Sequence, residues 1–173
     1  MIGDPVLRAR ANDVTDVDGA LVRLSDEMFE TMYEAAGIGL AAPQVGVQQR
    51  FFVYDHGEAG GVILNPEIAE SDGEWAFDEG CLSVPELSFE IVRPKQIHLV
   101  GIDLEGNEVS IEADEIEARL FQHEIDHLDG VLLVDHLDDD QSREARRVLR
   151  QMTMSRLAST PAGGQLDGGL RLR

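Results

Sequence analysis

The sequence has 173 residues, of which 43% are hydrophobic and 28% are charged. This size and composition are typical of a single globular domain and exclude a chain that is disordered throughout. With 14 basic and 34 acidic residues the formal net charge is −20, so we expect no nucleic-acid site on the main body, because phosphate would be repelled. The sequence has no apolar run long enough to span a bilayer and does not begin like a secretory signal. We therefore expect a cytoplasmic protein without a membrane segment.

An amphipathic helix is the first element that the sequence predicts. From Asp16 or Asp18 onward, apolar residues recur at steps of three and four as far as Ala35, which places them on one helix face. Gly37 follows as the expected C-terminal stop.

Short β-like runs, separated by Gly and Pro, characterise residues 50–113. The predicted strands are 51–54, 62–64, 74–77, 97–102 and 108–111. A hairpin turn at 104–107 is expected between the last two strands.

Two more helices are predicted in the last third of the chain. Asp114 is the expected N-cap of the first, with Glu117 three positions later in a capping box, and Gly130 lies beyond its end. The second covers residues 139–157. Residues 158–173 are rich in Gly and show no periodicity, so we expect a disordered tail after one domain, residues 1–157. The pattern as a whole predicts an α+β fold.

The sharpest chemical signal is the segment HEIDH at positions 123–127. On a helix, His123 and His127 share one face, so both imidazoles can bind one metal ion, with Glu124 beside it as a general base. The alternative is an exposed helix face with two solvated histidines. A catalytic ion needs a third protein ligand, with a fourth position left to water. The candidates are Cys81, a downstream His or a downstream acid.

Two further segments carry weaker signals. Cys81, the single cysteine, stands in EGCLS at 79–83, and a lone cysteine is more often a small core residue than a ligand. GIGLAAPQ at 37–44 packs small residues directly after the first helix. It is either a helix stop with a buried turn, or a place where a substrate approaches the backbone and the Gln44 amide donates to an oxyanion.

Together, GIGLAAPQ, EGCLS and QHEIDHLDG, in this order and at this spacing, resemble the three signature motifs of the peptide deformylase family. GDPVLR at 3–8 resembles that family's opening segment, and the similarity extends to about Leu137. It implies antiparallel β-sheets packed around a central HExxH-bearing helix, with an N-terminal and a C-terminal helix. It also implies an activity for residues 1–157, the metal-dependent hydrolysis of the formyl group from the N-terminal formyl-methionine of nascent polypeptides.

The resemblance implies a role for each motif residue. The implied metal ligands are Cys81, His123 and His127. Glu124 would be the general base and acid for a metal-bound water that attacks the formyl carbon, releasing formate. The oxyanion would be stabilised by Gln44 and by the backbone N–H of Leu82.

Substrate contacts are implied as well. Gly39 would bind the peptide through its backbone, and the methionine pocket would be lined by Ile38, Ile116, Leu120 and Phe77. Ser88 stands where some relatives carry a basic residue that meets the substrate backbone. Arg93 resembles a family arginine that supports the site through Glu79; an ordinary surface pair is the alternative.

The cofactor and partners are also implied by the resemblance. In this family the ion is usually Fe²⁺, with Zn²⁺, Ni²⁺ or Co²⁺ as substitutes, and Cys and His ligands suit zinc equally well. Residues 141–157 contain five arginines and one acid, Glu144. Such a run is usually a solvated face, but some deformylases dock on the ribosome through this helix, and we hypothesise the same. We expect a monomer.

Two other classes of protein stay open. A zinc endopeptidase of the HExxH type would take its third ligand downstream of His127, where His136 is available. A non-catalytic homologue that binds peptides or the ribosome would be expected to lack Glu124, Gln44 or a ligand, and none of these is missing.

Overall fold

The computed structural model describes residues 5–81 and 84–159, and the chain divides into two compact units, Met1–Leu137 and Asp138–Arg173. The helices of the first unit are α1 (Gly19–Glu34) and α2 (Glu115–Leu128), and three short 3-10 helices accompany them, Pro5–Arg8, Ala42–Val45 and Leu133–Asp135. The second unit contains α3 (Asp139–Ser159). Residues 160–173 of the predicted tail lie outside the described chain, and one catalytic domain over residues 1–157 stays a prediction.

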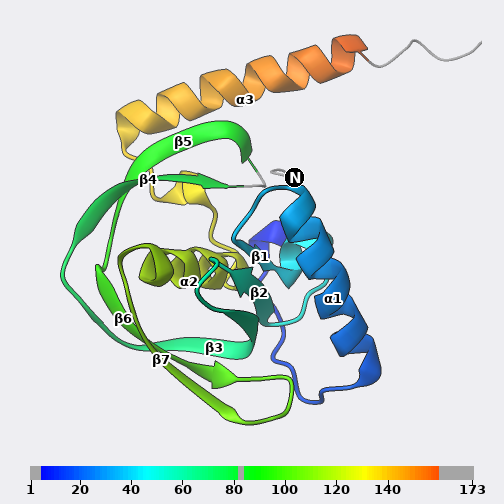
Figure 1. The fold of residues 1–173 in the computed structure, drawn as a ribbon. Coiled ribbons are helices and arrows are strands. Elements are labelled where there is room, and N and C mark those ends of the chain that lie inside the picture. Colours follow the sequence, from blue (N-terminus) through cyan, green and yellow to red (C-terminus); the bar gives the residue numbers. More distant parts are fainter. Residues whose placement is uncertain (1–4, 82–83, 160–173) are drawn as a thin grey trace, which may run out of the picture. The chain divides into compact units, whose positions relative to one another are not determined.

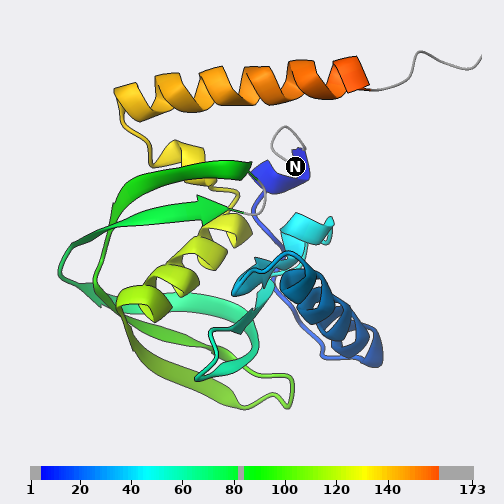
Figure 2. The same cartoon turned by 45° about the horizontal axis from the view of Figure 1, so that its top comes forward.

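Two antiparallel sheets build the first unit (Figure 1). The larger has the order β1-β2-β3-β6-β7, with bounds Gly39–Ala41, Phe51–Asp55, Gly60–Asp72, Gln96–Ile102 and Glu108–Asp114. The smaller pairs β4 (Trp75–Cys81) with β5 (Val84–Arg93). In both views α2 lies between the β4–β5 pair and the strands β3, β6 and β7 (Figures 1 and 2). The predicted α+β class is confirmed.

The strands are longer and more numerous than the predicted ones. The prediction ended a strand at Leu64 because Asn65 and Pro66 follow, yet β3 continues to Asp72 through a register shift between Leu64 and Glu67. Asn65 adopts a left-handed φ of 49° there, and a bulge tolerates a proline that cannot donate to the ladder. β1 and β5 have no predicted counterpart: β1 is only three residues long, and in β5 the alternation of Leu87, Phe89 and Ile91 with polar residues was missed.

Helix α1 begins as predicted and ends slightly differently. The Asp18 side chain accepts hydrogen bonds from the N–H groups of Ala20 and Leu21 at 2.9 and 2.8 Å, so of the two possible starts Asp18 is the N-cap. At the C-terminal end the left-handed residue is Ala36, with φ of 52°, and not Gly37. The Gly37 N–H instead donates to the Met32 carbonyl at 2.9 Å.

Helix α2 begins after Asp114, but the predicted capping box does not form. The Asp114 side chain makes no capping hydrogen bond, and the Glu117 carboxylate pairs with His56 Nε2 at 3.0 Å. Gly130 lies just beyond the end of the helix with φ of 74°, as its position predicted.

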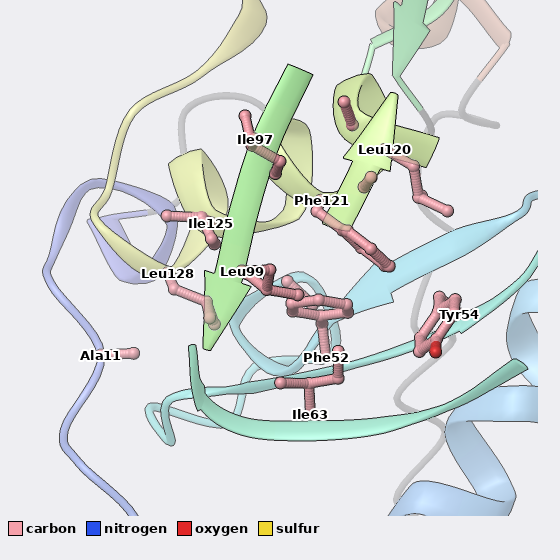
Figure 3. Packing of buried hydrophobic residues seen from close by; sticks show 13 residues of the cluster. Ala11, Phe52, Tyr54, Ile63, Ile97, Leu99, Leu120, Phe121, Ile125 and Leu128 are labelled. Carbon is pink, nitrogen blue, oxygen red and sulfur yellow. The ribbon is translucent and has the colours of Figure 1, made fainter. Parts of the chain in front are cut away.

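Helix α2 is anchored by the face that it turns toward the large sheet. Phe121 and Leu128 on this face are fully buried and pack with Phe52, Ile63 and Leu99 of the sheet (Figure 3). Each large apolar side chain buried in this way contributes about 1.5–3 kcal/mol. The opposite side of the helix carries its polar residues toward β4, so the core that holds α2 also fixes the position of those residues.

Candidate metal centre

Strand β4 and helix α2 bring the three predicted metal ligands together. Cys81 ends β4, and His123 and His127 are four residues apart on one face of α2. Cys81 Sγ lies 3.3 Å from His127 Nε2, and the Nε2 atoms of His127 and His123 are 3.2 Å apart. All three ligand atoms lie within 4.8 Å of one another.

These separations fit a single divalent ion. A tetrahedral site with ordinary metal–ligand distances has its nitrogens about 3.3 Å apart and its sulfur about 3.6 Å from each nitrogen, close to what the cluster shows. One thiolate and two imidazoles suit several first-row divalent ions. His136, the alternative third ligand, forms a hydrogen bond with Asp126 at 2.7 Å instead. Among the described residues it belongs to no group of side chains that could hold a metal ion.

Glu79 is a buried carboxylate, 5% exposed, at the centre of the hydrogen bonds behind the cluster. It accepts from His123 Nδ1 at 2.6 Å, from Arg93 Nε and Nη2 at 2.8 and 2.7 Å, and from Arg119 Nη1 at 2.8 Å. Burial acts to raise the pKa of Glu79, but the hydrogen bonds from Arg93 and His123 outweigh it and hold the pKa well below its usual range. The bond to Nδ1 therefore leaves Nε2 of His123 as its ligand atom.

The expected link between Arg93 and Glu79 is thus confirmed, and it is no surface pair. Arg93 is 5% exposed and also binds Asp126 through Nη1 at 2.8 Å. It lies behind the ligand cluster and ties β5 to α2.

The charge state of Cys81 favours metal binding, whereas His123 has to lose a proton before it can bind an ion. Burial acts to raise the pKa of the Cys81 thiol, but hydrogen bonds with His123 and His127 lower it to about 5. Burial acts to lower the pKa of His123, whereas hydrogen bonds with Cys81 and Glu79 raise it to about 10. The lowered pKa favours the thiolate of Cys81, which is the form that binds metal ions.

The Glu124 carboxylate lies beside the cluster and is 3% exposed. Burial raises its pKa, and within residues 5–81 and 84–159 its Oε2 atom has no hydrogen-bond partner. The backbone of Gly39 approaches so closely that an added Cβ would lie 2.5 Å from Glu124 Oε1 and 2.5 Å from Leu120 Cδ1. A Cβ at this position would push both side-chain ends aside, so strand β1 confines the carboxylate.

Gln44 is one of the two predicted oxyanion donors. Gln44 lines the cleft beside the cluster, and its Oε1 atom accepts from the Ala41 N–H at 2.7 Å. The amide nitrogen is therefore the donor end of this side chain. Leu82 lies outside the described residues.

A cleft of about 770 Å³ opens beside the ligand cluster. All four predicted substrate residues line it, together with the expected wall residue Phe77; the four are Ile38, Gly39, Ile116 and Leu120. The side chains of Ile38, Phe77 and Ile116 are 44%, 42% and 42% exposed. Exposed apolar side chains gathered at a cleft indicate a binding site for an apolar group.

The sequence analysis missed Arg119, a second buried cation of the site. It is 5% exposed and lines the cleft, and it reaches both Glu79 and the carbonyl of Trp75. A signal was available, because Arg119 precedes His123 by four residues and so shares its helix face.

The donor set defines the class of protein. Two imidazoles and a thiolate, beside a buried carboxylate and an apolar cleft, belong to a metal-dependent hydrolase. Comparison with known proteins gives the family: the sequence model of polypeptide deformylase matches residues 1–143. The chain belongs to the polypeptide deformylase family, whose members are hydrolases that remove the N-formyl group of nascent polypeptides.

Individual relatives agree with this assignment. A peptide deformylase from Halothermothrix orenii is 50% identical over 136 residues, which cover 78% of this chain and 88% of the relative. One from Thermotoga neapolitana is 44% identical and covers 94% and 97%. The crystal structure of a peptide deformylase from Legionella pneumophila superposes with a TM-score of 0.85 at 40% identity, covering 92% of this chain and 96% of that one.

The fold carries no helical membrane segment in its described part. Across residues 5–81 and 84–159, none of the helices combines the length and the apolar character that crossing a membrane requires.

Proposed function

We propose that the chain hydrolyses the formyl group of N-terminal formyl-methionine with one divalent ion held by Cys81, His123 and His127. The convergence of these three ligand atoms beside Glu124 and the cleft is the observation that supports it. We propose Fe²⁺ as the ion and Zn²⁺, Ni²⁺ or Co²⁺ as substitutes, since this donor set accepts each of them. When bound, the ion supplies a Lewis acid that polarises the formyl oxygen and acidifies the attacking water.

The proposed chemistry of the protein itself centres on Glu124. Its carboxylate takes a proton from the attacking water and returns it to the leaving nitrogen, so the C–N bond breaks to formate and a free amine. A buried carboxylate with a raised pKa suits both steps, because a group whose pKa is nearer to neutral pH can both accept the proton and return it. The Gln44 amide and the Leu82 N–H donate to the oxyanion, and loss of one such donor typically costs about 2.7–4 kcal/mol of barrier.

The methionine side chain is proposed to occupy the apolar cleft. Ile38, Ile116 and Leu120 contribute its apolar lining. The backbone of Gly39 lies at the same cleft and is the proposed partner of the peptide backbone, since a residue without Cβ permits close approach.

The decisive experiment measures formate release from a formyl-Met-Ala-Ser peptide by anaerobically prepared protein, with metal analysis of the same sample. Cys81→Ala should lose both metal and activity, and Glu124→Gln should keep the metal but lose about 10²-fold or more in kcat. His136→Ala is the matched control and should keep both. Retention of metal and peptidase activity by Cys81→Ala, with loss in His136→Ala, would establish the endopeptidase alternative instead.

The ribosome is the second proposed partner, through α3 of a cytoplasmic monomer. Two of the arginines already pair within the helix, Arg143 with Asp140 and Arg147 with Glu144, which leaves Arg146 and Arg150 as the better residues to test. Charge reversal of these two should abolish co-sedimentation with ribosomes at low salt. Unchanged co-sedimentation of that variant would remove the proposal.

A further inference from the structure

Arg119 contacts an aromatic wall made of Phe77, which lines the cleft, and Trp75, which stacks against Phe77. Its guanidinium carbon lies 5.0 Å from the ring centroid of Trp75 and 5.8 Å from that of Phe77, and the two rings stack with centroids 4.6 Å apart. Arg119 Nη2 also donates to the carbonyl oxygens of Trp75 and Ile91, at 2.7 and 3.1 Å. One cation thus contacts both aromatic rings and the backbone of both strands of the small sheet.

The same guanidinium reaches the metal ligands. Arg119 Nη1 donates to Glu79 Oε2 at 2.8 Å, and the other oxygen of Glu79 accepts from His123 Nδ1 at 2.6 Å. Two hydrogen bonds therefore separate the aromatic wall from a ligand ring. Arg93 binds the same carboxylate, but its second partner is Asp126 on α2, away from the aromatic wall.

Burying an arginine costs more free energy than burying an aliphatic side chain that fills the same space. Removing a guanidinium from water is costly unless each donor is matched, and an aliphatic side chain could pack against Trp75 without that cost. What an aliphatic side chain cannot do is bind two backbone carbonyls and a carboxylate while lying over two rings, which needs a planar fork. Phe77 lines the cleft and is 42% exposed, so packing alone holds it weakly.

We infer that Arg119 is a positioning residue that determines specificity: it fixes Phe77 against Trp75 and so sets the width of the cleft for an unbranched methionine side chain. Through Glu79 it joins that wall to the orientation of His123. The inference rests on the proposed function of the cleft as the methionine site.

The test compares kcat/KM for formyl-Met-Ala-Ser and formyl-Phe-Ala-Ser, because a loosened wall should admit the broader ring. Arg119→Met should raise KM for the methionine peptide and lower the Met/Phe ratio by about tenfold, the low end of what one methylene of misfit costs in an apolar pocket. Arg119→Lys keeps a charge for Glu79 but not the planar fork, so it should retain metal and still show the lowered ratio. Arg93→Met is the matched control: kcat and metal content should fall while the ratio stays at the wild-type value.

A double variant separates the wall from general loss of structure. In a Phe77→Leu background, Arg119→Lys should not lower the ratio further, because the group it positions is gone. An unchanged ratio in Arg119→Lys, or an equal loss in Arg93→Met, would overturn the inference. A wild-type protein that releases no formate would contradict the proposed function itself, and that outcome is distinguishable from these.

Discussion

Replacing Glu79 with glutamine tests whether this carboxylate organises the metal centre. The substitution keeps the shape of the side chain and removes its charge. In the native protein the carboxylate is 5% exposed and accepts four hydrogen bonds, from Arg93, Arg119 and His123. A glutamine offers one oxygen in place of two, and its amide N–H groups would face other donors.

The expected loss is large because two buried guanidinium groups lose their shared counter-charge. Breaking a buried ion pair from one side typically costs about 3–5 kcal/mol. In a domain of this size each kcal/mol lowers Tm by about 2–4 °C, so Glu79→Gln should melt about 6–20 °C below the wild type. Metal affinity should fall about 10- to 100-fold, because the hydrogen bond that orients His123 is weakened.

Thermal unfolding and metal titration measure the two effects, and Glu74→Gln is the matched control, since Glu74 is exposed one residue before β4. The pKa of Glu79 in the fold lies below its unfolded value of about 4.3. Its stabilisation is therefore complete above that pH and is lost as the pH falls toward the folded pKa. With the metal removed by a chelator, the difference in Tm between wild type and Glu79→Gln should become smaller below about pH 4. Equal melting and equal metal affinity of the two proteins would refute this reasoning.

Three further substitutions have defined outcomes. Gly39→Ala puts a Cβ 2.5 Å from Glu124 Oε1, so kcat should fall while metal content stays at the wild-type level; steady-state kinetics with an unchanged kcat would contradict this. Asp129→Ala removes the carboxylate 2.5 Å from the buried Arg50, and urea unfolding should show a loss of about 1–3 kcal/mol with unchanged activity per bound metal. Gly101→Ala brings a Cβ 2.6 Å from the Ile63 side chain and should cost about 1–3 kcal/mol in the same assay; wild-type unfolding curves would show that either site relaxes.

Local patterns carried much of the prediction. The spacing of apolar residues from Asp16 or Asp18 onward predicted α1, and the four-residue spacing of His123 and His127 predicted a shared helix face. Both depend on interactions within a few residues, which periodicity reports directly. The same reasoning failed at Asp114, whose side chain makes no capping hydrogen bond, while the expected partner Glu117 binds His56 on a distant segment.

The partners across the fold were decided by tertiary structure. The motif pattern placed Cys81, His123 and His127 in one family site, but only the packing of β4 against α2 brings the sulfur within 3.3 Å of an imidazole 46 residues away. The burial of Glu79 between two arginines had no local sign, because alternation shows which face of a strand a residue occupies and not which charge it meets there. The four-residue spacing from His123 could have placed Arg119 on the same helix face, whereas its contact with Trp75 depends on a strand 44 residues earlier.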